Sequence, residues 1–133
     1  MIIRMRNIPM SFDGSVPLKT ASVHMIDLIG KFPGYNLTDI AEHLGVTKGA
    51  VSQMAALLEK KGVIERKKGE GNNICFSLTP EGRKVFNGHE RYHKDLYAKL
   101  ARIIGDYSEE DLNKLDLLMS QVEKSMLEYS ENI

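Results

Sequence analysis

The chain has 133 residues, of which 42% are hydrophobic and 27% are charged, and its formal net charge is zero. These values exclude bulk disorder, and no apolar run approaches the roughly 20 residues that a membrane span needs. The single cysteine, Cys75, excludes an internal disulfide, and Met1–Met10 lacks the pattern of a signal peptide, so we expect a cytoplasmic protein that does not enter a membrane.

The zero net charge hides an uneven distribution. From Gly45 to Val85 there are eight Lys/Arg and four Asp/Glu, whereas from Phe86 to Ile133 there are six and ten. The middle segment is therefore a candidate surface for a polyanion, and the tail is not. Charge alone does not separate this interpretation from an ordinary solvated surface.

Two short helices joined by a tight turn are predicted after a first helix. That first helix spans Lys19–Phe32 and ends at Pro33-Gly34. Thr38 is the predicted N-cap of a helix over Asp39–Leu44, with Gly45 as its stop. Thr47 caps the next helix, which is expected to run to about Lys61 with an apolar face of Val51, Met54, Ala55 and Leu58.

A β-hairpin is predicted next. Val63–Lys68 and Ile74–Leu78 have the composition of strands, and Ile74, Phe76 and Leu78 alternate with more polar residues at the period of a half-buried strand. The intervening Gly and Asn residues favour a turn.

Two long helices are predicted to complete the chain. Thr79-Pro80-Glu81 is a strong helix start, and that helix can run to about Ile104 with Val85 and His89 on its inner stripe. Ser108 caps the last helix, with Asp111 in a capping-box position. Apolar residues then repeat at heptad spacing, which predicts a dimer seam of Leu112, Leu115, Met119, Val122 and Met126.

The order helix, short turn, helix, hairpin is typical of a winged helix-turn-helix, whose second helix enters the DNA major groove. We therefore predict a mainly α fold with a small antiparallel β-hairpin wing and N- and C-terminal dimerisation helices. The DNA-binding residues are predicted on the second helix, where Lys48, Ser52 and Gln53 suit base edges and phosphates, and on the hairpin. The full set is Thr47, Lys48, Gly49, Ser52, Gln53, Arg66, Lys67 and Lys68.

These residues bring out a family resemblance. Leu37–Thr47 (LTDIAEHLGVT), Val51–Arg66 (VSQMAALLEKKGVIER) and Ser77–Val85 (SLTPEGRKV) resemble the MarR family of transcription regulators, and Ser108–Met119 resembles its C-terminal dimerisation helix. The resemblance implies a homodimer on a pseudo-palindromic double-stranded DNA operator, acting as a repressor that a small-molecule or metal effector releases. It also implies one MarR-like domain over residues 1–133, with a DNA-binding core at 18–86 and a dimerisation region at 1–17 and 87–133.

The chain departs from the family pattern in two places. The wing tip of the family usually carries Asp-x-Arg, with the arginine in the minor groove, whereas here Glu70–Asn73 contains no arginine. The wing contacts are therefore expected from Lys67, Lys68 or the asparagines. The family usually has a long helix before the counterpart of Lys19–Phe32. Only about 17 residues precede Lys19–Phe32 here, which shortens that part of the predicted dimer interface.

The histidines suggest two alternatives to a plain structural role. His89-Glu90-Arg91-Tyr92-His93 matches H-E-x-x-H, the signature of zinc proteases, which would make the chain a metal-dependent hydrolase. We expect no enzyme, because the motif follows a wing and no other feature suggests a substrate cleft. A winged helix that binds a protein instead of DNA is the other competing class, and the basic middle segment disfavours it.

A regulatory metal site is the second alternative. His89 and His93 are four residues apart on one predicted helix face, and together with His24 they are similar to the histidine ligands of zinc-responsive MarR regulators. A glutamate completes the site in those proteins, and Asp27, Asp13 or water would take its place here. The competing interpretation is that the histidines are hydrogen-bonded structural residues.

Overall fold

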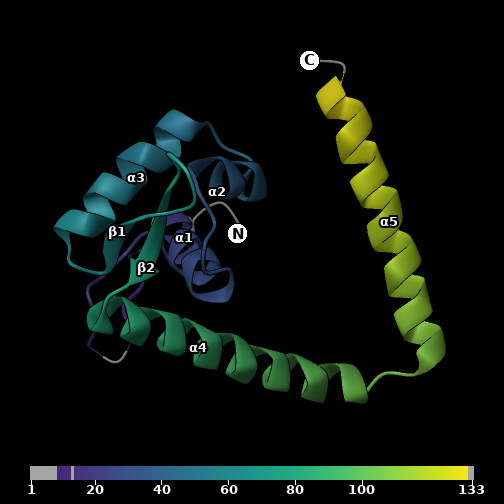
Figure 1. The fold of residues 1–133 in the computed structure, drawn as a ribbon. Helices are drawn as coiled ribbons and strands as arrows, with labels where there is room; N and C mark the ends of the chain where they lie inside the picture. The colour runs from purple at the N-terminus through teal and green to yellow at the C-terminus, as the bar shows by residue number, and fades with distance from the viewer. Residues whose placement is uncertain (1–8, 13, 132–133) are drawn as a thin grey trace. The chain divides into compact units, whose positions relative to one another are not determined.

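The computed structural model describes residues 9–12 and 14–131 (Figure 1). The described part divides into two compact units, one ending at Tyr92 and one beginning at His93, and this division falls within a helix. The elements in chain order are α1 Thr20–Lys31, α2 Leu37–Leu44, α3 Lys48–Lys60, β1 Ile64–Lys68, β2 Ile74–Leu78, α4 Pro80–Gly105 and α5 Glu109–Glu131. No helix among the described residues is both long enough and apolar enough to cross a membrane. The mainly helical fold with a two-stranded antiparallel hairpin confirms the predicted fold class.

The hydrophobic core lies in the first unit and is centred on α1. Met25 and Ile26 of this helix have no exposed surface, because α2, β2 and the described residues just before α1 pack around it. The segment before α1 contributes to the core as well, since Phe12 is 9% exposed and Met10 pairs with Leu18 in a short antiparallel bridge.

The predicted start of α2 is wrong by two residues. Asn36 is the N-cap, not Thr38: the backbone N–H of Asp39 donates to Asn36 Oδ1 at 2.9 Å, and the N–H of Asn36 donates to Asp39 Oδ2 at 3.0 Å. This capping box satisfies two backbone donors, which a threonine cap at position 38 would leave without partners. Gly45 ends the helix with φ +66°, as predicted.

The wing follows α3 and is anchored to α4 at its base. β1 and β2 pair with Arg66 opposite Phe76, and the turn that leads into β1 has Gly62 at φ +73°. Thr79 closes the base, because its hydroxyl donates to the carbonyl of Gly62 at 2.6 Å and accepts from the N–H of Gly82 at 3.1 Å. Thr79 is thus the N-cap of α4, as predicted.

Two glycines let the beginning of α4 approach the rest of the first unit closely. A Cβ added at Gly82 would lie 1.8 Å from the carbonyl oxygen of Val63, and one at Gly88 would lie 2.2 Å from the Cβ of Phe12. Only glycine fits at such contacts. Val85 and His89 on the same helix are buried, as predicted.

The second unit contains the rest of α4 and all of α5. Ser108 and Asp111 form the predicted capping contacts at the start of α5, at 3.1 and 3.4 Å. Leu100 and Ile103 of α4 are 42% and 58% exposed in the single chain. Apolar residues on both helices of this unit are therefore open to solvent in one copy.

Candidate nucleic-acid interface and histidine cluster

The start of α3 presents a polar, exposed face over a buried apolar one. Thr47 caps the helix by accepting the N–H of Ala50 at 3.1 Å. The buried stripe of Val51, Ala55 and Leu58 has no exposed surface, which fixes the rotation of the helix. The opposite face contains the five DNA-binding residues predicted for this helix and its cap, which we call the reading face. All five are exposed: Thr47, Lys48, Gly49, Ser52 and Gln53.

The three basic residues predicted as wing contacts have different surroundings. Lys67 and Lys68 are exposed on β1, and among the described residues neither has an ion-pair partner. The guanidinium of Arg66, in contrast, donates from Nη2 and Nε to Glu59 Oε1 of α3 at 2.7 and 3.2 Å. Its Cζ also lies 5.6 Å from the centre of the Phe76 ring. Sequence reasoning missed this pairing.

A cavity of about 710 Å³ lies between the wing and the loop that joins α1 to α2. Sequence reasoning did not find it, because its lining comes from two segments about thirty residues apart. The lining residues include Tyr35, Asn36, Lys68, Glu70 and Cys75. Cys75 is half-buried here, and its backbone forms an isolated antiparallel β-bridge with that of Asn36.

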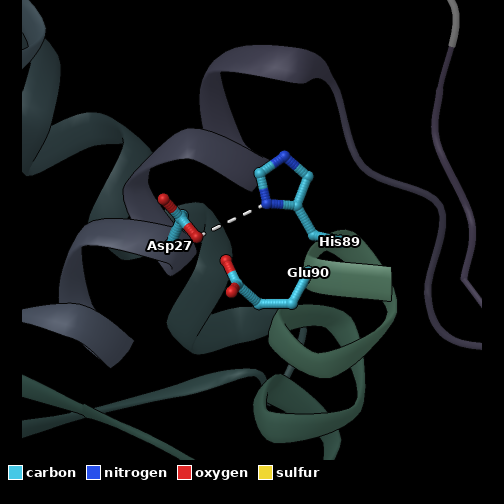
Figure 2. A group of neighbouring side chains, drawn as sticks. All are labelled: Asp27, His89 and Glu90. Carbon is cyan, nitrogen blue, oxygen red and sulfur yellow. Dashed lines mark ion pairs between the residues drawn. The ribbon is translucent and has the colours of Figure 1, made fainter. Parts of the chain in front are cut away.

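The structure places a charge cluster between α1 and α4 around His89 (Figure 2). The Nδ1 of His89, a 5% exposed residue, lies 3.4 Å from Asp27 Oδ1. The ammonium of Lys31 contacts Asp27 Oδ2 at 2.9 Å and Glu90 Oε1 at 3.2 Å. The hydrogen bond that Lys31 donates to Asp27, aided by the carboxylate of Glu90, raises the pKa of Lys31 above its ordinary value.

The predicted metal-binding histidines are only partly brought together. The rings of His24 and His89 have centres 6.1 Å apart, but His24 is exposed. Among the described residues, one group of three side chains offers possible metal-ligand atoms that all lie within 4.8 Å of one another. The three are Asp27, His89 and Glu90. Of the predicted substitute ligands, Asp27 thus joins His89, while Asp13 lies outside the described residues. His93 belongs to the second unit, where its ring lies 5.6 Å from that of Tyr97.

The predicted dimer seam is exposed along α5. Leu115, Met119, Val122 and Met126 are 54%, 58%, 45% and 69% exposed, and Leu112 is half-buried. Within the same unit, the end of α4 and the start of α5 form a largely apolar groove of about 530 Å³, lined by Ile103, Ile104, Tyr107, Asp111, Leu112 and Leu115.

Comparison with known proteins agrees with this architecture. Residues 18–73 match the model of the MarR family. The chain is 26% identical over 110 residues to the uncharacterized HTH-type transcriptional regulator YhjH of Bacillus subtilis (strain 168), covering 81% of this chain. It spans 63% of the length of that relative.

Two solved structures illustrate the shared fold. Streptococcus pneumoniae FabT in complex with DNA is similar with a TM-score of 0.69 and 29% identity, over 96% of this chain and 87% of FabT. The zinc-responsive MarR family member ZitR of Lactococcus lactis has a TM-score of 0.76 over 90% of this chain and 83% of ZitR. At 16% identity, ZitR supports the fold alone.

The helix pair with its exposed polar face and the anchored hairpin define a winged helix-turn-helix protein. The matched family and relative are those of transcription regulators and not of enzymes, so the H-E-x-x-H pattern of His89–His93 does not mark a protease. The chain therefore resembles the MarR family, whose model it matches over residues 18–73.

Proposed function

We propose that the chain binds double-stranded DNA in a sequence-specific manner and regulates transcription. The observation that carries the proposal is the exposed face at the start of α3, where Lys48, Ser52 and Gln53 project from a helix held by a buried stripe. Glutamine pairs with adenine, and lysine reaches a guanine edge or a phosphate. The surplus of positive charge from Gly45 to Val85 supports binding to a polyanion.

Selection of duplexes from a random library by the purified protein tests the proposal. We expect one enriched sequence with two related half-sites. The Lys48→Ala/Gln53→Ala double variant should lose the preference, while Lys94→Ala, which removes an exposed lysine of α4 with the same net charge change, should largely keep it. Tight binding of the Lys48→Ala/Gln53→Ala variant to the selected site would contradict the assignment of the reading face.

The assembly that we propose is a homodimer formed through the apolar face of α5. This face extends over several turns, and it joins the groove at the end of α4. A contiguous apolar surface of this kind is seldom left to solvent, and a second copy offers an identical surface with the same heptad spacing. A dimer also supplies the two reading helices that a site with two half-sites needs.

We further propose that the protein is a repressor and that a divalent metal, zinc foremost, is its effector. The donor types fit zinc, which takes imidazole nitrogens and carboxylate oxygens. The imidazole of His89 already faces Asp27, and His24 lies beside it. A bound metal would displace the ammonium of Lys31 from two carboxylates, so one cation replaces another. The part of His93 rests on its sequence spacing from His89 alone. A small-molecule effector is the competing possibility.

Zinc titration of the metal-free protein, followed by calorimetry and by operator affinity, tests the metal proposal. The His89→Ala variant should lose zinc binding, and a change in operator affinity with zinc should disappear with it. His43 is the matched control, because its ring packs against Phe32 and Tyr35, outside the cluster. Unchanged zinc affinity in His89→Ala, or zinc that leaves operator affinity unaltered, would overturn the metal proposal without affecting the DNA-binding one.

A further inference from the structure

Arg66 lies between the two parts of the molecule that are proposed to touch DNA, and its side chain is already engaged. Two of its N–H groups donate to one carboxylate oxygen of Glu59, in the last turn of α3. The flat face of its guanidinium lies over Phe76, which is 4% exposed and pairs with Arg66 across the hairpin. Arginine uses both its planar fork and its face in such contacts.

Glu59 occupies a position where a carboxylate is unfavourable on its own. It is the penultimate residue of α3, and the end of a helix carries a partial negative charge that repels an acidic side chain. The guanidinium of Arg66 compensates both negative charges. The ion pair with Arg66 is therefore favourable for Glu59. Among the described residues, it is the ion pair that connects α3 with the wing.

The neighbouring lysine provides a contrast on the same strand. Successive side chains of a strand point to opposite faces, so Lys67 lies on the opposite face of the wing from Arg66. Lys67 is exposed, and among the described residues it has no ion-pair partner. Lys67 is therefore available to a phosphate, whereas Arg66 would first have to leave Glu59 and Phe76.

From these contacts we propose that Arg66 is a positioning residue. It acts through Glu59 to fix the wing relative to the recognition helix, and it does not itself neutralise a phosphate. This inference rests on the proposed DNA-binding function, because the geometry of the wing relative to α3 matters only if both meet one duplex. Hydrogen bonds of Lys61–Val63 fix the base of the wing. The Glu59–Arg66 ion pair adds a second contact between α3 and the wing, at a residue of β1 nearer the tip.

Operator affinity as a function of salt separates positioning from phosphate contact. The probe is the duplex selected from the random library, measured with the full chain over a series of KCl concentrations. Arg66→Ala should weaken binding about two- to fivefold, the factor that corresponds to the free energy of an exposed ion pair, with an unchanged salt slope. Lys67→Ala, the matched control, should reduce the slope by about one. A fall of about one in the slope of Arg66→Ala would overturn the proposal.

Glu59→Gln gives the opposite sign under the two interpretations. If Arg66 contacts DNA and Glu59 only repels the DNA phosphates, removing the acidic charge of Glu59 should tighten DNA binding. If the pair positions the wing, Glu59→Gln should weaken specific binding by the same factor as Arg66→Ala, and the double variant should be no weaker than either single one. Tighter binding by Glu59→Gln, or losses that multiply in the double variant, would refute the positioning role.

Hydrogen exchange of the free protein tests the pair without DNA. Amides of Lys67, Cys75 and their neighbours in the wing should exchange faster in Glu59→Gln and Arg66→Ala than in the original chain, while those of α1 should be unchanged. Equal exchange in the wing would overturn the inference whatever the DNA results. If the library yields no preferred sequence, the proposed function fails, and exchange still decides whether the pair holds the wing.

Discussion

Two glycine-to-alanine substitutions should change stability in opposite directions. At Gly82, the new Cβ would lie 1.8 Å from the carbonyl oxygen of Val63, where 3.0 Å is the practical limit. The start of α4 and the base of the wing would have to separate by roughly 1 Å, which overpacking data put at about 1–3 kcal/mol.

The same movement strains the hydrogen bonds at that joint. The N–H of Thr79 donates to the carbonyl of Val63 at 3.2 Å, and the hydroxyl of Thr79 donates to that of Gly62 at 2.6 Å. Each is worth about 1 kcal/mol net. Adding these losses to the overpacking and subtracting the better helix propensity of alanine, we expect Gly82→Ala to cost about 2–4 kcal/mol and to lower Tm by on the order of 10 °C.

Gly49→Ala is the matched control. It lies in α3, and its Cβ would meet nothing closer than Thr47 Oγ1 at 3.9 Å. Alanine should therefore stabilise the protein by about 0.5–1 kcal/mol through helix propensity. Because Gly49 lies on the proposed reading face, the more stable variant should nevertheless bind its operator less well. Denaturant unfolding of both variants at one protein concentration is the measurement. Shifts of the same sign in the two variants, or a Gly82→Ala variant as stable as the original, would refute the reasoning.

Three other substitutions test separate parts of the molecule. Leu115 is 54% exposed, so dimer formation can gain only about half of the 1.5–3 kcal/mol that burial of a leucine side chain is worth. Leu115→Glu should raise the dimer Kd at least about tenfold in sedimentation, whereas Asn113→Glu on the other face of α5 should not. Gln53→Ala should change the preference for one base pair by about 1–3 kcal/mol in competition binding. Lys31→Met should cost at most about 1 kcal/mol, because Lys31 is 45% exposed and screened. Because the pKa of Lys31 is raised in the folded state, its ion pairs contribute their full stability at any pH below the ordinary lysine pKa, and this stability is lost only as pH rises through the raised pKa. The free-energy cost of Lys31→Met should therefore be equal at pH 6 and pH 8. A cost that differs between the two pH values would show that another group titrates.

Local signals in the sequence predicted most of the elements. The caps of α3, α4 and α5 are at Thr47, Thr79 and Ser108 as predicted, because a capping side chain bonds to a backbone group only two or three residues away. The buried stripe of α3 followed from its period for the same reason, since one helix face repeats every three to four residues. The predicted start of α2 was wrong because Asn36 and Thr38 are both good N-caps. The backbone of Asn36 also forms a β-bridge with Cys75 of the wing, a contact that the local sequence does not show.

The contacts that join separate segments came only from the tertiary structure. His89 faces Asp27, and Arg66 binds Glu59 instead of lying open beside Lys67, because folding brings distant or reversed stretches of chain together. Nor does composition show that Gly82 must be glycine, since the carbonyl that excludes a Cβ belongs to Val63 on the far side of the hairpin. The sequence thus determined which helices and strands form and where most begin, since those depend on residues within one turn or one strand. Only packing decided which charges pair and where two backbones touch, since those depend on distances that no local pattern contains.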